Sequence, residues 1–303
     1  PNIDRMAANG MRMKNAFVTT SLCSPSRASI LTGLYAHRHR ILDNSTLLPD
    51  TIPTFPVLLR NAGYRTGFIG KWHMGGTSDA PRPGFDRWVS FKGQGVYENP
   101  AFNIDGEQVR REGYVTDLIT DYAMEFIERS KERPFFLYMS HKAVHAGFIP
   151  APRHKGRYAG VRPPRPVSFD DTGANYRGKP DWVRRQRNSW HGVDGMYNKT
   201  TDFDQFYRDY CETVLAVDDS VGRLYQTLES LGMANDALVI FMGDNGFLFG
   251  EHGLIDKRCM YEPSIRIPMI ACCPSLIRKG SVEERIALNI DIAPTMLDAA
   301  GLT

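Results

Sequence analysis

The chain has 303 residues, of which 42% are hydrophobic and 23% are charged, and its formal net charge is +3 at pH 7. This length suits one large globular domain or one and a half ordinary ones. No run of 18 apolar residues occurs, so we expect no membrane-spanning helix. The small positive charge favours an anionic substrate only weakly. The five cysteines match no zinc-binding or Cys-x-x-Cys spacing.

Apolar runs predict strands, and apolar residues at helical spacing predict helices between them. The predicted strands span 66–69, 135–139, 238–242 and 267–271. The predicted helices span 55–63, 117–129 and 206–231, and glycines at 63 and 232 mark the ends of two of them. Strands that alternate with helices predict an α/β fold with a mostly parallel sheet.

The stretch 149–201 differs from the rest of the chain. It is rich in Pro, Gly, Arg, Asp and Trp and shows no helical or strand period. We therefore expect an irregular insertion within the domain, and such insertions usually carry function or move.

Polar clusters directly follow three of the predicted strands. They contain Lys71 and His73, then His141 and His145, then Asp244 and Asn245. Ligands of α/β sheets bind at the carboxyl ends of strands. One such cluster alone indicates only a solvated loop, but three of them predict a common site at one rim of the sheet.

A nucleophile is predicted at Cys23. The segment after it predicts a helix whose first turn begins near Pro25, the favoured entry position for proline. The positive end of the helix dipole and the nearby Arg27 lower the pKa of a thiol placed there and attract anions.

These segments together resemble the signatures of the formylglycine-dependent sulfatases, which have the alkaline phosphatase-like α/β fold. The motifs occur in family order, and the resemblance extends from Pro1 to Thr303. The residues that carry it are Cys23-x-Pro25-x-Arg27-x-x-x-Leu31-Thr32-Gly33, the segment from Gly63 to His73, Gly243-Asp244-Asn245-Gly246, Gly250-Glu251-His252-Gly253 and Asp256-Lys257.

The resemblance implies a nucleophile made from Cys23 by oxidation to formylglycine, which requires a formylglycine-generating maturase. The hydrated aldehyde attacks sulfur, leaves a sulfated enzyme, and expels sulfate through its second hydroxyl. In this scheme Arg27 and Lys71 hold the nucleophile, and His73 accepts the proton that triggers sulfate release.

The resemblance also implies contacts to the sulfate and a metal site. His145 and Lys257 contact the sulfate, and His145 protonates the leaving oxygen. The family often has proline before this histidine, whereas Val144 stands here, so His141 remains a rival for the role. Asp244 and Asn245 bind a divalent cation, usually calcium, through hard oxygen ligands.

Two parts of the family's fold are expected to lie outside this chain. One is a first strand that ends in two further metal-binding aspartates, and the other is a C-terminal subdomain. We therefore expect a catalytic domain over 1–303 that is truncated at both ends, with weak or absent metal binding and activity when taken alone.

The late motifs look most like the glucosamine-6-sulfatase and polysaccharide-sulfatase branch, which implies a sulfated carbohydrate as substrate. The resemblance further implies a secreted, periplasmic or lysosome-like location, and we expect neither nucleic acid nor membrane as a partner. Two alternatives stay open, a phosphatase or phosphonate hydrolase of the same superfamily and a non-catalytic relative that binds sulfated glycans. The first normally has Thr or Ser as nucleophile, and the second is expected to lack Cys23, Lys71, His73 or Lys257.

Overall fold

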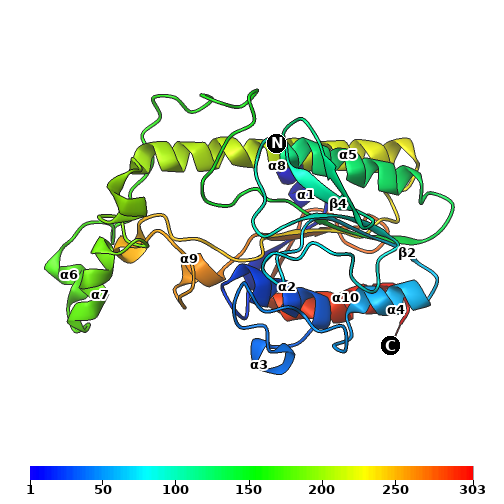
Figure 1. Ribbon diagram of the computed structural model, residues 1–303, viewed down its shortest axis with the longest axis horizontal. Helices are drawn as coiled ribbons and strands as arrows, with labels where there is room; N and C mark the ends of the chain where they lie inside the picture. Colours follow the sequence, from blue (N-terminus) through cyan, green and yellow to red (C-terminus); the bar gives the residue numbers. More distant parts are fainter. Residues whose placement is uncertain (303) are drawn as a thin grey trace.

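A computed structural model describes residues 1–302 of the protein, except for the side chain of Asn198. Helices cover both faces of two mixed sheets (Figure 1). The helices are α1 (Asn2–Asn9), α2 (Cys23–Thr32), α3 (Ala36–His39), α4 (Phe55–Asn61), α5 (Val115–Glu128), α6 (Gly173–Tyr176), α7 (Asp181–Arg185), α8 (Phe203–Ser230), α9 (Glu262–Ile265) and α10 (Ile292–Ala299). The strands are β1 (Met11–Phe17), β2 (Arg65–Lys71), β3 (Arg87–Phe91), β4 (Ala101–Ile104), β5 (Glu107–Arg110), β6 (Phe135–Ser140), β7 (Val239–Met242), β8 (Met269–Cys272) and β9 (Ser281–Leu288).

The two sheets have the strand orders β5-β4-β3-β2-β6 and β7-β8-β1-β9. Pairing is parallel between β2 and both of its neighbours and between β1 and β9, and it is antiparallel elsewhere. The α/β class is therefore confirmed, but the sheets are mixed rather than mostly parallel. Strands β3, β4 and β5 follow one another through short connections, which permit only antiparallel pairing.

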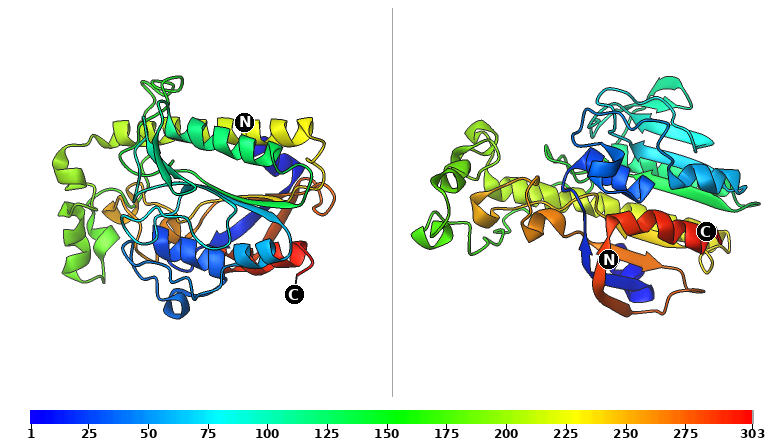
Figure 2. Two further views of the ribbon diagram at one scale, coloured as in Figure 1. Left: turned by 45° about the vertical axis from the view of Figure 1, so that its right-hand side comes forward. Right: turned by 90° about the horizontal axis from the view of Figure 1, so that it is seen from below.

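The strands and helices expected from the sequence are present, with boundaries that differ by a few residues. The four predicted strands are β2, β6, β7 and β8, and the three predicted helices are α4, α5 and α8. The stretch 149–201 contains only α6, α7 and the 3₁₀ turns η1 (Gln186–Asn188) and η2 (Met196–Lys199), and within the described residues its β-pairing is limited to one bridge at Gly192. Its helices α6 and α7 project at one end of the molecule (Figure 2).

Side chains of the buried strands point alternately to the two faces of the five-stranded sheet, and an apolar core lies on each face. On one face Ile69 packs with side chains of α5 and α8. On the other face Phe68 packs with α2, α4 and α10 and stacks on Trp88, with ring centroids 4.7 Å apart. Strand residues point alternately to opposite faces, so neighbours in β2 serve different cores. Figure 1 shows α5 and α8 on one side and α2, α4 and α10 on the other.

A separate apolar cluster attaches the stretch 149–201 to the body of the molecule. Its buried members are Phe148, Met196, Phe203, Phe206 and Ile255. They join the beginning of α8 to the segment before Lys257, so this cluster borders one side of the predicted site. Between residues 1 and 302, no helix is both long enough and apolar enough to cross a membrane.

Candidate active site

Helix α2 places Cys23 in its first turn. The sequence predicted a helix that begins near Pro25, but the helix begins two residues earlier, at Cys23, after an extended Leu22. Gly33 ends the helix with a φ of 68°, and its N–H donates to the carbonyl of Ser29 at 2.9 Å. A left-handed residue at this position is the usual way to end a helix, and glycine adopts that conformation without strain. Cys23 is buried, with 1% of its surface exposed.

The close approach of β2 and β6 positions Lys71. Gly70 has a φ of 123° and pairs with Ser140, and a Cβ at this glycine would lie 1.8 Å from the carbonyl oxygen of Ser140. Only glycine fits there, so the strands meet tightly just before Lys71 leaves the sheet. The side chain of Lys71 then turns toward Cys23, with its ammonium nitrogen 3.7 Å from the sulfur.

Arg27 connects the ends of three strands. Its Nε and Nη2 donate to Oδ2 of Asp244 at 2.9 and 2.7 Å, and its Nη1 donates to the carbonyl of Lys71 and to Oγ of Ser140. These partners lie at the ends of β7, β2 and β6. The predicted convergence of three polar clusters is therefore present, and a planar guanidinium with several donors can bind all of them at once.

Four cationic or titratable side chains surround the sulfur of Cys23. Lys257 donates to it at 3.4 Å and Lys71 at 3.7 Å, and His73 and His145 lie close enough to lower the pKa of the thiol. Lys257 comes from the loop after η3 (Glu251–Gly253), and His145 comes from the loop after β6. The structure therefore brings the six predicted catalytic residues together, since Arg27 donates to the carbonyl oxygen of Lys71.

The environment of Cys23 favours negative charge. Burial raises the pKa of the thiol, but Lys71 and the hydrogen bonds from His145 and His73 outweigh burial and place the pKa well below its ordinary value. A group that develops negative charge at this position is stabilised in the same way.

The cationic residues lose part of their proton affinity because they are buried together. Burial lowers the pKa of Lys71 to about 8, and it also lowers the pKa of His73 and of His145. A bound anion would reverse this shift, since it favours the charged forms of all three side chains. The site thus has a deficit of negative charge that an anionic ligand can fill.

His145 and His141 have different surroundings. His145 lies close enough to Cys23 to lower the pKa of its thiol, and the Nδ1 atom of His145 lies 3.1 Å from the carbonyl oxygen of Ala146. His141 instead places Nε2 3.1 Å from Oγ of Ser220 in α8, and burial lowers its pKa to about 4. The geometry therefore favours His145 over His141 at the reacting centre.

Asp244 and Asn245 offer oxygen atoms at the end of β7. Burial raises the pKa of Asp244, but Arg27, Lys71 and Lys257 lower it far more, so its carboxylate is charged. Both bonds from Arg27 reach Oδ2 of Asp244, and Oδ1 of Asn245 is buried without a hydrogen-bond partner. An orphaned amide oxygen beside a carboxylate fits a hard cation. Within residues 1–302, no group of three or more His, Cys, Asp or Glu side chains is placed to hold a metal.

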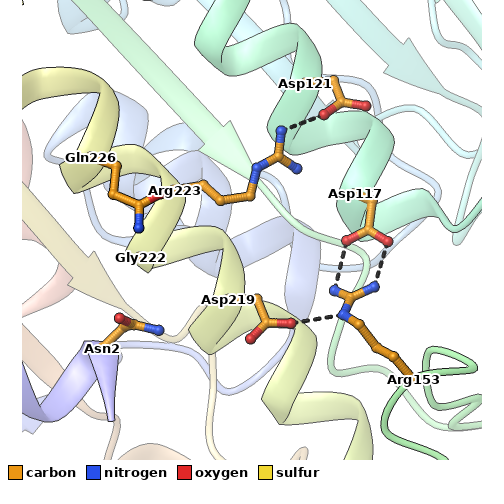
Figure 3. A pocket seen from close by; sticks show the side chains of 8 residues that line it. All are labelled: Asn2, Asp117, Asp121, Arg153, Asp219, Gly222, Arg223 and Gln226. Carbon is orange, nitrogen blue, oxygen red and sulfur yellow. Dashed lines mark hydrogen bonds and ion pairs between the residues drawn. The ribbon is translucent and has the colours of Figure 1, made fainter. Parts of the chain in front are cut away.

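A second hollow lies between α5 and α8, apart from this site (Figure 3). Its volume is about 560 Å³, and its charged residues are paired with one another. Arg153 bonds to Asp117 and Asp219, and Arg223 bonds to Asp121. None of the predicted site residues lines this hollow, and the ion pairs of Arg153 hold the start of the stretch 149–201 against α5 and α8.

Sequence reasoning missed Ser140 as a member of the site. Its hydroxyl donates to the carbonyl of Lys71 at 2.9 Å and accepts from Arg27. The signal was available, because Ser140 is the last residue of a buried strand and immediately precedes His141, which had been singled out.

Comparison with known proteins agrees with this geometry. The family model of the sulfatases matches residues 1–302. The chain belongs to the sulfatase family. The N-acetylglucosamine-6-O-sulfatase of Bacteroides thetaiotaomicron is 36% identical over the whole chain, which covers 63% of that protein. The N-acetylglucosamine-6-sulfatase of Capra hircus is 33% identical over 96% of the chain, which covers 55% of it. The chain thus spans less than two thirds of the length of these curated relatives.

A solved structure confirms the fold. A protein in complex with its substrate D-glucosamine-2-N,6-O-disulfate superimposes with a TM-score of 0.89 at 36% identity, and the match covers 100% of this chain and 72% of that one. The alkaline phosphatase-like fold of the sulfatase family is therefore the fold of this chain.

Proposed function

We propose that the protein to which this chain belongs hydrolyses sulfate esters of a carbohydrate. The observation that carries the proposal is the group of Lys71, Lys257, His73 and His145 around the buried Cys23. A sulfate ester is an anion whose oxygens gain and redistribute charge during hydrolysis, so a preorganised group of cations stabilises the transition state.

Conversion of Cys23 to formylglycine by a maturase is part of the proposal. When hydrated, this group supplies one hydroxyl that attacks sulfur and a second hydroxyl that allows the resulting sulfated enzyme to release sulfate. Lys71 lies within reach of the reacting position and holds charge there, and Arg27 fixes the Lys71 backbone through its carbonyl. His73 reaches the same position and is buried, so it is suited to accept the proton whose removal releases sulfate.

His145 is proposed to protonate the leaving oxygen. Because a carbonyl oxygen only accepts, the contact between Nδ1 and Ala146 favours a proton on Nδ1 and directs Nε2 toward the reacting position. In its protonated form the ring can then donate from Nε2. Lys257, on the side of the loop after η3, is proposed to bind the sulfate oxygens.

A divalent cation, calcium in the family, would be held by Asp244 and Asn245. Bound there, the cation would supply positive charge to the sulfate oxygens. The orphaned Oδ1 of Asn245 supports this assignment.

The proposed substrate class is a glucosamine-type sugar with a 6-O-sulfate. This rests on the names of the two relatives and on the ligand of the similar solved structure. A secreted, periplasmic or lysosome-like location fits this substrate, and the matched relatives include proteins named as extracellular sulfatases.

The nucleophile can be tested by mass spectrometry of the tryptic peptide 15–27, from the whole protein co-expressed with a formylglycine-generating enzyme. Conversion of Cys23 should lower the peptide mass by about 18 Da, since the side-chain thiol becomes an aldehyde. Sulfate release from glucosamine 6-sulfate should rise with the converted fraction. A protein that remains unconverted beside a converted control sulfatase, or that releases phosphate rather than sulfate from matched esters, would contradict the proposal.

A further inference from the structure

The hydroxyl of Tyr97 bonds to both backbone polar groups of His145. It accepts from the N–H of His145 at 3.1 Å and donates to the carbonyl oxygen of His145 at 2.9 Å. Tyr97 lies in the connection between β3 and β4, 48 residues before His145, and is 3% exposed. A buried hydroxyl that both donates and accepts at one residue fixes the position of that residue's backbone.

A second contact joins the same two segments. Lys142 lies three residues before His145, and its ammonium donates at 3.1 Å to the carbonyl oxygen of Gln94, which lies three residues before Tyr97. The same ammonium lies 4.5 Å from the centre of the Tyr97 ring, a distance typical of a cation–π contact. The connection after β3 and the loop after β6 are therefore cross-linked at two places with equal spacing.

The ring of Tyr97 also packs against a second tyrosine. Tyr114, which precedes α5, stacks on it with ring centroids 5.9 Å apart and an angle of 20° between the planes. The hydroxyl of Tyr114 donates to the carbonyl oxygen of Ile149 at 2.8 Å. Two stacked tyrosines thus bind two points of one loop, one at His145 and one four residues later.

These contacts matter because the loop after β6 has no helix or strand to hold it. From His141 to Ile149 the backbone is irregular, yet His145 must present Nε2 to the reacting position while Nδ1 faces Ala146. A shift of about 1 Å in such a group can cost about 100-fold in rate.

We propose that Tyr97 is a positioning residue that sets His145 for protonation of the leaving oxygen, supported by Lys142. This inference rests on the proposed sulfatase function and deepens it. It predicts that loss of the Tyr97 hydroxyl lowers the rate most for substrates whose leaving oxygen must be protonated.

The test compares Tyr97→Phe with the wild-type whole protein on two substrates. The sugar alcohol of glucosamine 6-sulfate is a poor leaving group and needs protonation, whereas the phenolate of 4-nitrophenyl sulfate leaves without it. We expect kcat/KM to fall by about 10- to 100-fold on the sugar sulfate, mainly through kcat, and by less than about 3-fold on the aryl sulfate.

Tyr114→Phe is the matched control, because it removes a hydroxyl of the same kind from the same stack but spares His145. It should change both substrates by less than about 3-fold. If Tyr97→Phe is too unstable to purify, Lys142→Met breaks the second cross-link and should give the same selective loss to a smaller degree.

An equal loss on both substrates in Tyr97→Phe, or a selective loss of the same size in Tyr114→Phe, would overturn the assignment and leave a structural role for the stack. A wild-type protein that hydrolyses neither sulfate ester after conversion of Cys23 would instead defeat the proposed function itself.

Discussion

Arg27 and Asp244 form the ion pair on which the site is built. The Arg27 side chain is 8% exposed and that of Asp244 is 24% exposed, so most of their hydration is lost on folding. Such a pair is stable only if its remaining donors are satisfied, and the carbonyl of Lys71 and the hydroxyl of Ser140 satisfy them. Since Asp244 ends a strand of one sheet and Lys71 a strand of the other, the pair also connects the two sheets.

Asp244→Asn should therefore destabilise the fold by about 3–5 kcal/mol, because it leaves the buried Arg27 charge without a carboxylate. Urea unfolding near neutral pH measures this. Asp50→Asn is the control, since its ion pair with Arg82 involves a carboxylate that is 60% exposed and should cost less than about 1 kcal/mol. Equal effects of the two changes would show that the Arg27 pair contributes no more than a surface pair.

Because the pKa of Asp244 is lowered, the stability contributed by the Arg27–Asp244 ion pair depends on pH. A depressed pKa in the folded state stabilises the protein above the unfolded value of 3.8, and the stabilisation is lost as the pH falls toward the folded value. The difference in stability between the wild type and Asp244→Asn should accordingly shrink below pH 4. A difference that stays constant down to pH 2 would contradict the charge assignment.

In the proposed mechanism, catalysis should weaken as the pH rises, for two reasons. His145 must carry a proton, and burial places its pKa below the ordinary value of 6.5. Lys71 must be charged, and its pKa is lowered to about 8, while conversion of Cys23 removes a thiolate that raises this pKa. A plot of kcat/KM against pH should therefore fall in two steps as the pH rises, and the second step should lie at or below about pH 8.

Lys71→Arg provides the check on the second step, because arginine stays charged throughout this range. Whatever its absolute rate, its profile should lack the step near pH 8. A wild-type profile that is flat up to pH 9, or an unchanged step in Lys71→Arg, would remove Lys71 from the assignment.

Helix α8 is the element that organises the stretch 149–201. Its buried Glu212 accepts from the N–H groups of Gly156 and Tyr158, both at 2.9 Å, and its Asp219 binds Arg153 and His154. The first part of the stretch 149–201 is thus bound to α8 at several points, although the stretch has little regular structure of its own.

Glu212→Ala should release this part of the chain, because two backbone N–H groups lose their acceptor at about 1–3 kcal/mol each. We expect faster tryptic cleavage after the exposed Arg157 while the rest of the protein stays intact. Glu229→Ala, an exposed position on the same helix, is the matched control and should leave the cleavage rate unchanged. Similar cleavage in both variants would show that Glu212 does not hold the segment.

The sequence predicted those strands and helices that show a pattern of apolar residues within their own length. Long buried strands such as β2 and β6 show as apolar runs, and α8 shows a helical period. Strand β9 was missed because its residues are all exposed or half-buried and form no apolar run. The β4–β5 hairpin could have been found, since Asp105-Gly106 at its turn, with φ of 52° and 106°, is a strong hairpin signal.

The residues proposed for the site stand in local sequence motifs, whereas the fold that surrounds them depends on long-range contacts. Cys23, Arg27 and Lys71 belong to motifs whose chemistry can be inferred from residue type and spacing. The proposed role of Tyr97 could not be inferred from the sequence, because it depends on a contact between residues that are 48 positions apart. Strand order likewise depends on long-range pairing that no local pattern encodes.

At the scale of the whole molecule, two sheets and three strand ends meet at one place, and a cation is proposed to join them. Calcium should raise the melting temperature of the whole protein, since a ligand at 100 times its Kd stabilises the folded state by about 2.7 kcal/mol. Asn245→Leu keeps the size of the side chain but removes the orphaned oxygen, so the calcium-dependent shift should shrink. An equal shift in the wild type and in Asn245→Leu would place calcium elsewhere.

The most direct test of the sulfatase assignment is sulfate release from N-acetylglucosamine 6-sulfate by the whole protein with Cys23 converted, measured beside Cys23→Ala. The expected result is turnover by the converted protein and a rate at background for Cys23→Ala, which retains the cations but lacks the nucleophile. A converted protein that releases no sulfate, or a Cys23→Ala variant that releases it at the same rate, would contradict the central role of Cys23.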